Sequence, residues 1–278
     1  MLATALDEML IGPTGDPHAF LNAAASRFRD PAVGDADTLS FGLDLGTATV
    51  VLTAVDAAGR PVYWDAVQCQ AIHDGVVVNF AEAVASVRKL KADAERVLAC
   101  KIFDAATAHP PGVPQADCRA CRYVLEQAEI NCRALVDEVS AAQALLGLED
   151  GAIADVGGGS TGVGVFEGGR LVTLSDRPGG GHYLDLILAG AQRIPIEEAE
   201  RRKRMAPADY VAVLRPGLER IASSIKEQLG KASVASIHLV GGAIRLPEAG
   251  AIIARVTGVP TKTYPHADLV TPFGIAVS

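Results

Sequence analysis

Segments with the apolar spacing of β-strands and segments with the apolar spacing of helices follow one another along this chain. Residues 42–62, GLDLGTATVVLTAVDAAGRPV, carry apolar and β-branched residues on either side of a Gly-containing turn, which predicts a β-hairpin. Residues 81–99 and 117–130 instead repeat apolar positions every three or four residues, with charges between them, and this spacing predicts two helices. A short strand is predicted around residues 132–139.

The second half of the chain returns to the plan of the first hairpin. Residues 153–172, IADVGGGSTGVGVFEGGRLV, again lead apolar strand residues into Asp-apolar-Gly, then into a small-residue turn and a second β-rich strand. Helices are predicted over residues 179–194, 195–205 and 209–231, then a strand, a Gly-Gly turn and a helix within 236–258, and a strand, turn or helix over 269–278. This internal similarity indicates a duplicated α/β architecture, in which Asp44 and Asp155 face each other across one cleft.

The residues before Leu39 do not share this plan. Residues 2–10, LATALDEML, place Leu2, Leu6, Met9 and Leu10 on one side of an amphipathic turn or two, and a Gly-, Pro- and Asp-containing loop leads to the first strand. We expect an appendage that packs on the core or is mobile. A docking peptide is the alternative use, and an ordinary packing helix is favoured over it.

Composition and charge exclude several classes of protein. Of the 278 residues 49% are hydrophobic but only 5% aromatic, so a core of Ala, Val, Leu and Ile is expected. The formal charge of -8 argues against a nucleic-acid partner. No apolar run approaches the roughly 20 residues that cross a bilayer, and no secretory signal opens the chain, so we expect a cytoplasmic protein without a membrane partner.

The five cysteines do not indicate a disulfide framework, because their number is odd and no secretory signal accompanies them. Cys118 and Cys121 have the C-x-x-C spacing of metal and redox sites. A second ligand pair is missing and the segment is predicted to be helical, so a structural role is favoured.

Three glycine-rich elements occur in order, and Asp precedes two of them. A lone GGGST turn is weak evidence, and the sequence is neither a Walker A loop nor a dinucleotide-binding fingerprint. Backbone N–H groups in such turns bind phosphate oxygens closely, but a neighbouring carboxylate repels phosphate. A divalent cation resolves this conflict, because Mg²⁺ is held by one or two carboxylates together with substrate phosphates. Asp44 and Asp155 are therefore predicted to flank a Mg²⁺–polyphosphate complex.

The three motifs LDLGTATV, ADVGGGSTG and HLVGGAIRLPE resemble the phosphate 1, phosphate 2 and adenosine motifs of the actin, hexokinase and heat-shock-chaperone ATPase superfamily. Within it, the chain is similar to the EutJ ethanolamine-utilisation family, chaperone-like ATPases encoded with bacterial microcompartments. HDGVVVNF, VDEVSAA, residues 177–204 and TPFGIAVS support this resemblance, which runs from about Leu39 to Ser278. It implies a duplicated actin-like (ribonuclease H-like) α/β fold with two lobes around a nucleotide cleft. The implied parts are an appendage at 1–38, a first lobe at 39–148 and a second lobe at 149–278, with a few C-terminal residues returning to the first lobe.

The resemblance also implies roles for individual residues. Asp44 and Asp155 hold Mg²⁺ through water, and Glu138 positions the attacking water. The residues implied to wrap the phosphates are Gly46, Thr47, Gly157, Gly158, Gly159 and Ser160, and the Thr161 hydroxyl is a further candidate donor. Gly241 and Gly242 are implied to lie beneath the nucleoside, and Glu200 and Lys203 to contact it from a helix. The alternative for this helix is a charged, solvent-exposed face without a ligand.

Three departures from the superfamily pattern point to slow chemistry. Val139 replaces a proline of the chaperones, Gly162 falls where they carry another acid, and no clear match to their catalytic lysine is found. The unmatched candidates for that lysine are Lys89, Lys91 and Lys101, and the candidate bases His73 and His182 are assigned to surface or capping roles. Because Mg²⁺-assisted transfer relies on positioning and charge stabilisation, we expect slow hydrolysis rather than loss of nucleotide binding.

The leading hypothesis from the sequence is a Mg-ATP-binding, slowly hydrolysing, chaperone-like switch with ATP/ADP and Mg²⁺ as cofactors. The resemblance implies client proteins among the enzymes of ethanolamine utilisation or the shell of a microcompartment, and a cytoplasmic location that includes association with that compartment. Three alternatives stay open: a small-molecule kinase of the same superfamily, a filament-forming actin-like protein, and a nucleotide-binding pseudoenzyme.

Overall fold

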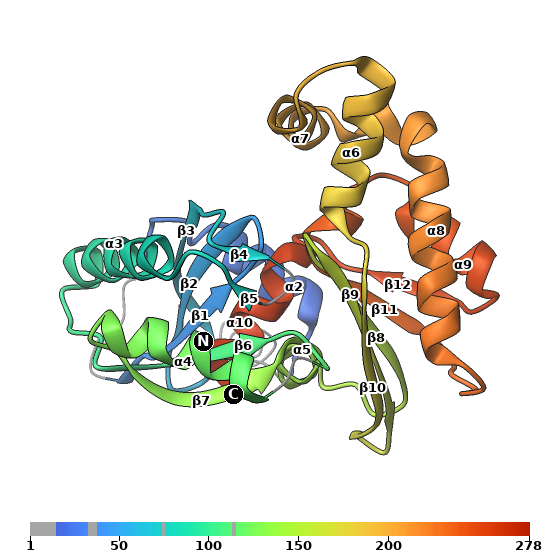
Figure 1. Ribbon diagram of the computed structural model, residues 1–278. Helices are drawn as coiled ribbons and strands as arrows, with labels where there is room; N and C mark the ends of the chain where they lie inside the picture. The colour runs from blue at the N-terminus through green and yellow to red at the C-terminus, as the bar shows by residue number, and fades with distance from the viewer. Residues whose placement is uncertain (1–14, 33–37, 74–75, 113–114) are drawn as a thin grey trace. The chain divides into compact units, whose positions relative to one another are not determined.

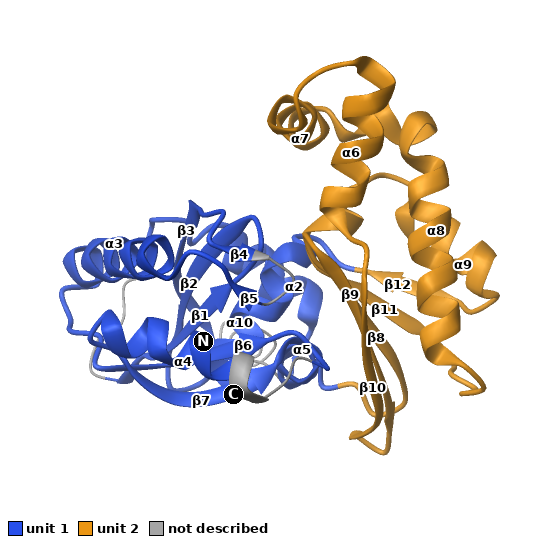
Figure 2. Cartoon of the chain, viewed as in Figure 1, with its two compact units in different colours: residues 1–147, 264–278 blue, residues 148–263 orange. Residues whose placement is uncertain are grey.

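The computed structural model describes residues 15–32, 38–73, 76–112 and 115–278. By their internal contacts the residues form two compact units (Figure 1). Unit 1 comprises Met1–Gly147 and Tyr264–Ser278, and unit 2 comprises Leu148–Thr263 (Figure 2). The C-terminal residues therefore belong to the same unit as the first strand, and unit 2 is one continuous stretch of chain.

Unit 1 contains a five-stranded mixed sheet. Its strands are β1 (Ser40–Leu45), β2 (Thr49–Val55), β3 (Pro61–Gln68), β6 (Asp104–His109) and β7 (Asn131–Asp137). They lie in the order β3-β2-β1-β6-β7, with β1 to β3 antiparallel and with β6 and β7 parallel to β1. The predicted hairpin and the predicted strand near residue 132 are confirmed, whereas β6, an Ala-rich stretch, has no strand prediction.

The helices of unit 1 lie on both faces of this sheet. They are α2 (Pro17–Ala25), α3 (Phe80–Leu98), α4 (Gln115–Gln127), α5 (Glu138–Leu146) and α10 (Val270–Val277), with a short turn η4 (Ala267–Leu269) and a small hairpin of β4 (Ile72–His73) and β5 (Val76–Val77). Ala105 of β6 belongs to the large core on the side of α3 and α4, while its neighbour Ala106 packs with Ala141 of α5 and Ile275 of α10. Alternate residues of one strand thus point into two separate cores.

The C-terminal segment, for which the sequence leaves strand, turn and helix open, is helix α10. It packs against β1, β2, β6 and α5. A Cβ atom at Gly274 would lie 2.0 Å from the carbonyl oxygen of Ala141, and one at Gly42 of β1 would lie 2.6 Å from the backbone nitrogen of Ala276. These glycines allow the backbones of α10, α5 and β1 to approach more closely than any side chain would permit.

Unit 2 repeats the sheet of unit 1. Its strands are β8 (Gly151–Val156), β9 (Ser160–Glu167), β10 (Arg170–Pro178), β11 (Ile237–Val240) and β12 (Thr261–Thr263), in the order β10-β9-β8-β11-β12. As in unit 1, three antiparallel strands are followed by two that run parallel to the first. Asp44 pairs with Val51 across the first hairpin, and Asp155 pairs with Gly162 across the second, seven residues further on in each case. The duplication expected from the sequence is confirmed strand by strand.

The helices of unit 2 confirm the sequence predictions closely. They are α6 (Gly181–Gln192), α7 (Ile196–Met205), α8 (Val211–Leu229) and α9 (Ala249–Thr257), with short turns η2 (Pro207–Tyr210) and η3 (Gly242–Arg245). Helices α3 and α8 each have 19 residues, but both carry charges along their length. In the ranges that the structure describes, no helix combines the length and apolar character needed to cross a membrane.

The described part of the N-terminal region covers the β3 edge of the first sheet. Helix α2 buries Phe20 and Leu21 completely. Beyond it, Arg29 N–H donates to the carbonyl of Trp64 at 2.9 Å, and Ala32 N–H donates to that of Val62 at 2.9 Å. Residues 27–32, predicted as loop, thus run along β3 and satisfy its outer hydrogen-bonding groups. The predicted amphipathic residues 2–10 lie outside the described part of the chain.

Candidate functional site

The first Asp-containing turn joins β1 to β2. Asp44 is the second-last residue of β1 and is half-buried, and Gly46 N–H donates to the carbonyl of Thr49 at 3.1 Å. A Cβ at Gly46 would lie 2.9 Å from that same oxygen, so the turn needs glycine there. Among the hydrogen bonds of the described residues, none has the amides of Thr47 or Ala48 as donor. The tip of this turn therefore offers N–H groups to a ligand.

Glu138 and Asp44 lie at the same end of the sheet, where the parallel strands β1, β6 and β7 finish. Strand β7 ends at Asp137, whose side chain caps helix α5 by accepting from Ser140 N–H at 2.8 Å, and Glu138 is the first residue of that helix. The parallel register aligns Leu43 with Thr107 and Thr107 with Leu135, so β1 and β7 end together. Both predicted acids of unit 1 are thus placed at the carboxyl ends of two parallel strands that are separated by β6, at the end of the sheet where α/β proteins bind ligands.

Cys121 of α4 is buried in the large core of unit 1. Burial raises the pKa of its thiol to about 12, and the negative charges of Cys118, Glu138 and Asp44 add to that shift. Cys118 and Cys121 are both buried residues of α4.

The second Asp-containing turn, between β8 and β9, has the geometry of the first. Asp155 is 6% exposed, and Gly157 N–H donates to the carbonyl of Ser160 at 3.0 Å. The carbonyls of Gly157, Gly158 and Gly159 accept hydrogen bonds from the amides of Gly181, His182 and Gly179, at 2.9, 2.8 and 2.8 Å. Within the described residues the amides of Gly158 and Gly159 donate to no other group. The carbonyl side of this loop is therefore satisfied by hydrogen bonds from the start of α6.

The hydroxyl groups of this loop differ in their surroundings. Thr161 is buried and its Oγ1 donates to the carbonyl of Gly179 at 2.6 Å, so the hydroxyl supports the loop from behind. Ser160, at 9% exposed, begins β9 at the end of the turn. His182, an exposed residue, contributes its backbone amide to the loop, and the side chain of His73 lies outside the described part.

Gly241 lies directly against Asp155, and Gly242 follows it in the chain. Strand β11 ends at Val240, which is in register with Asp155 on the parallel neighbour β8. Gly241 has a φ of 95°, and a Cβ there would lie 2.5 Å from Asp155 Oδ1 and 2.4 Å from the carbonyl oxygen of Val156. Only glycine fits both the backbone angle and the space. The structure thus brings the phosphate 2 and adenosine motifs together at one edge of the second sheet.

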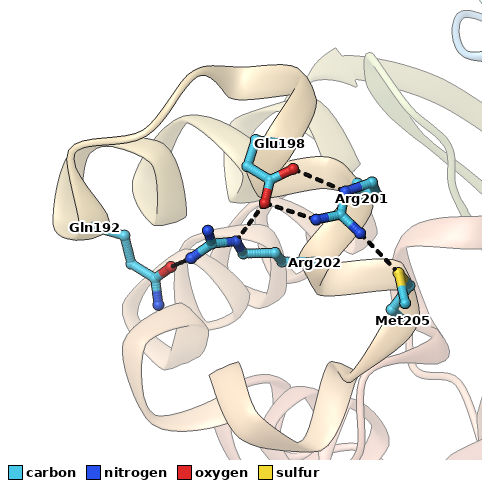
Figure 3. A network of polar contacts seen from close by, with 5 residues as sticks. All are labelled: Gln192, Glu198, Arg201, Arg202 and Met205. Atoms are coloured by element: carbon cyan, nitrogen blue, oxygen red, sulfur yellow. Dashed lines mark hydrogen bonds and ion pairs between the residues drawn. The ribbon is translucent and has the colours of Figure 1, made fainter.

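The predicted pair on α7, Glu200 and Lys203, is engaged within unit 2. Glu200 Oε1 accepts from Arg204 at 2.5 Å, and the Lys203 ammonium lies 2.6 Å from Asp185 Oδ1. Figure 3 shows a second network on the same helix, in which Arg201 and Arg202 both donate to Glu198. These hydrogen bonds lower the pKa of Glu198 to about 2, with that from Arg201 the larger cause. A nucleoside contact by Glu200 or Lys203 stays a prediction.

Two features of the sites are not found from the sequence. The support of the second turn by the backbone of residues 179–182 is signalled only by the glycines there, and Asp185, the partner of Lys203, has no signal at all.

Of the lysine candidates, Lys91 donates to the carbonyl of Glu129 at 2.8 Å and Lys101 pairs with Glu95 at 2.7 Å. In the described residues no three His, Cys, Asp or Glu side chains group as a metal site.

The repeated sheet and its two Asp-x-Gly turns define an actin-like ATPase fold. A PilM–PilN type IV pilus biogenesis complex shares it, with a TM-score of 0.72 at 13% identity over 87% of this chain and 98% of the other. MreB5 of Spiroplasma citri bound to ADP shares it with a TM-score of 0.70 at 15% identity, over 86% and 95% of the two chains. Identities this low establish the fold alone.

Closer similarity identifies the family. Ethanolamine utilization protein EutJ of Salmonella typhimurium is 34% identical over 257 residues, 92% of this chain and 91% of that protein. EutJ of Escherichia coli K12 is 31% identical over 93% and 92% of the two chains. The crystal structure of EutJ from Carboxydothermus hydrogenoformans matches with a TM-score of 0.89 at 36% identity, covering 94% and 98% of the two chains. The chain belongs to the EutJ family of ethanolamine utilisation proteins, although no protein-family model matches it. The resemblance inferred from the motifs is confirmed.

Proposed function

We propose that this EutJ protein binds Mg-ATP through its two Asp-x-Gly turns and hydrolyses it slowly. The observation that carries the proposal is the repetition of one turn in both units, with Gly46 N–H and Gly157 N–H closing it by the same hydrogen bond at 3.1 and 3.0 Å. Each turn follows a carboxylate and leaves N–H groups at its tip. That combination suits an anion accompanied by a cation.

The proposed roles follow from this arrangement. Asp44 and Asp155 would hold Mg²⁺ through its water shell, and the ion would supply charge neutralisation to the phosphates. The residues proposed to donate to phosphate are Gly46, Thr47, Gly157, Gly158, Gly159 and Ser160, with Thr161 holding the loop in shape. Glu138, at the start of α5, orients the attacking water. Gly241, Gly242 and Glu200 border the nucleoside.

Slow turnover is proposed because the acid of the chaperones is replaced by Gly162, and no lysine is assigned to the phosphates. Without these charges the negative charge that develops on the transferred group is less well stabilised, although ground-state binding is retained. The protein then acts as a switch whose state depends on the nucleotide. We propose that it serves as a chaperone for enzymes or shell proteins of ethanolamine utilisation, in the cytoplasm at a microcompartment.

Calorimetry on the full chain tests nucleotide binding. Mg-ATP and Mg-ADP are titrated with and without the metal into the wild type, into Asp155→Ala and into a matched variant, Asp209→Ala, at an exposed acid of the same unit. Binding that requires Mg²⁺, that Asp155→Ala abolishes and that Asp209→Ala keeps is the expected result. A wild type that binds neither nucleotide contradicts the proposal.

An assay of ATP consumption separates slow hydrolysis from kinase activity. Slow phosphate release without any acceptor, lost in Glu138→Gln while Mg-ATP binding persists, is expected of the proposed ATPase. Consumption that begins only when an alcohol or an acid is added would identify a small-molecule kinase instead.

A further inference from the structure

Lys203 and Asp185 form a buried ion pair that joins two helices of unit 2. Lys203 Nζ lies 2.6 Å from Asp185 Oδ1, with only 11% and 7% of the two side chains exposed. The neighbouring pairs of Glu198 with Arg201 and Arg202 stay within α7, and their side chains are 28 to 58% exposed. A charge buried to this extent is stable only with its partner in place, so the pair fixes α7 against α6.

The same ammonium group holds the backbone that supports the phosphate 2 loop. Lys203 Nζ donates to the carbonyl of Gly181 at 3.0 Å, and Gly181 N–H donates to the carbonyl of Gly157 at 2.9 Å. A single residue, Gly181, thus separates the Lys203 ammonium from the loop that follows Asp155. Charge-assisted hydrogen bonds are stronger than neutral ones, so this connection is well suited to fix a backbone.

The packing around Gly180 leaves no freedom between these segments. A Cβ at Gly180 would lie 2.4 Å from the carbonyl oxygen of Gly157 and 3.0 Å from those of Gly158 and Ser160. A Cβ at Gly181 would lie 3.5 Å from Ala243 Cβ, in the turn that follows Gly242. A shift of the first turn of α6 is therefore transmitted to the phosphate 2 loop, Gly157–Ser160, through these backbone contacts.

We propose that Lys203 is a positioning residue, which acts on phosphate binding through Gly181 and the phosphate 2 loop rather than by touching the nucleotide. This inference rests on the proposed function, since it assigns a task within the Mg-ATP site. In this assignment α7 is coupled to the loop, so any partner that moves α7 alters phosphate affinity. The role differs from the nucleoside grip expected from the resemblance, and the two make opposite predictions.

Lys203→Met separates the two roles when Mg-ATP and adenosine are compared as ligands in calorimetry or competition. A positioning residue predicts that the variant weakens Mg-ATP by about tenfold or more and adenosine less than twofold, because adenosine has no phosphates. Lys203→Arg keeps the charge and the donors and should recover part of the affinity. The matched control is Lys226→Met, since Lys226 Nζ also donates to a backbone carbonyl of unit 2, that of Val256 at 3.1 Å. Equal losses for both ligands, or no loss, overturn the positioning role.

Hydrogen exchange tests the connection without any nucleotide. The amides of residues 179–182 should exchange about tenfold faster or more in Lys203→Met, and at the wild-type rate in Lys226→Met. Because Lys203→Met leaves Asp185 buried without its partner, the neutral double variant Asp185→Asn, Lys203→Met is measured beside it and should show the same acceleration. Unchanged exchange in both overturns the inference. A wild type that binds no Mg-ATP refutes the proposed function, and the exchange result still decides whether Lys203 holds the loop.

Discussion

Gly274 of α10 is the position where the addition of one methyl group should change stability most clearly. A Cβ there would lie 2.0 Å from the carbonyl oxygen of Ala141, 2.5 Å from its carbon and 3.2 Å from the nitrogen of Ala142. Real Cβ contacts are at least 3.0 Å, so α10 and α5 must separate by about 1 Å at this point. The contact is with backbone, and no side chain can rotate away to relieve it.

Two effects of Gly274→Ala oppose each other. Alanine in a helix gains roughly 0.5–1 kcal/mol over glycine, because the unfolded chain loses conformational freedom. Overpacking of a close interface costs about 1–3 kcal/mol, and the full value applies to a backbone clash. We expect the free energy of unfolding to fall by about 2 kcal/mol, which lowers Tm by roughly 4–8 °C.

Fluorescence of Trp64, the single tryptophan of the chain, follows urea unfolding of unit 1, and far-UV circular dichroism follows both units. The matched control is Gly190→Ala in α6, where a Cβ meets no atom within 4 Å. It should gain roughly 0.5–1 kcal/mol. If Gly274→Ala is as stable as the wild type or gains stability like the control, the close approach of α10 to α5 is wrong.

Three further predictions concern other parts of the chain. Gly241→Ala should abolish Mg-ATP binding in calorimetry and destabilise unit 2 by about 2 kcal/mol more than Gly230→Ala, because Gly230 also has a positive φ, of 58°, but no close contact. Burial, with a smaller effect of Lys262, lowers the pKa of His238 to about 4. Between pH 6.5 and 4 the unfolded chain therefore binds more protons than the folded chain. The contribution of neutral His238 to the free energy of unfolding is complete above pH 6.5, and up to about 3 kcal/mol of it is lost as the pH falls towards 4. Denaturation curves of His238→Leu should not show this loss. A chain starting at Leu39 exposes the β3 edge, so light scattering should detect association and thermal melts a lower Tm; a monomeric truncated chain of wild-type stability would contradict this.

The parts of the fold found from the sequence are those whose signals are local. Each hairpin lies within about two dozen residues, and its β-branched residues, Asp-apolar-Gly turn and following glycines can be read directly. The helices of unit 2 likewise show regular apolar spacing. The sequence therefore places both turns of the candidate site correctly at strand ends.

The parts that the sequence does not predict depend on contacts between distant segments. The stretch DAATAH becomes β6 because it lies between β1 and β7, although alanine has little preference for strands. The tail VTPFGIAV becomes α10, despite its Pro, Gly and β-branched residues, because its residues are almost all buried against β1 and α5. The ion pair of Lys203 with Asp185 joins two helices, and no spacing rule connects them.

The return of α10 to unit 1 also sets the order in which the protein can be completed during translation. Unit 2 is continuous, so all of its strands are available once Thr263 has been synthesised. Unit 1 emerges first but lacks Phe273 and Ile275, which are fully buried in its core, until the last residues of the described chain follow. The first unit to leave the ribosome is thus the last to close its core, and in the interval the apolar face that α10 covers stays exposed.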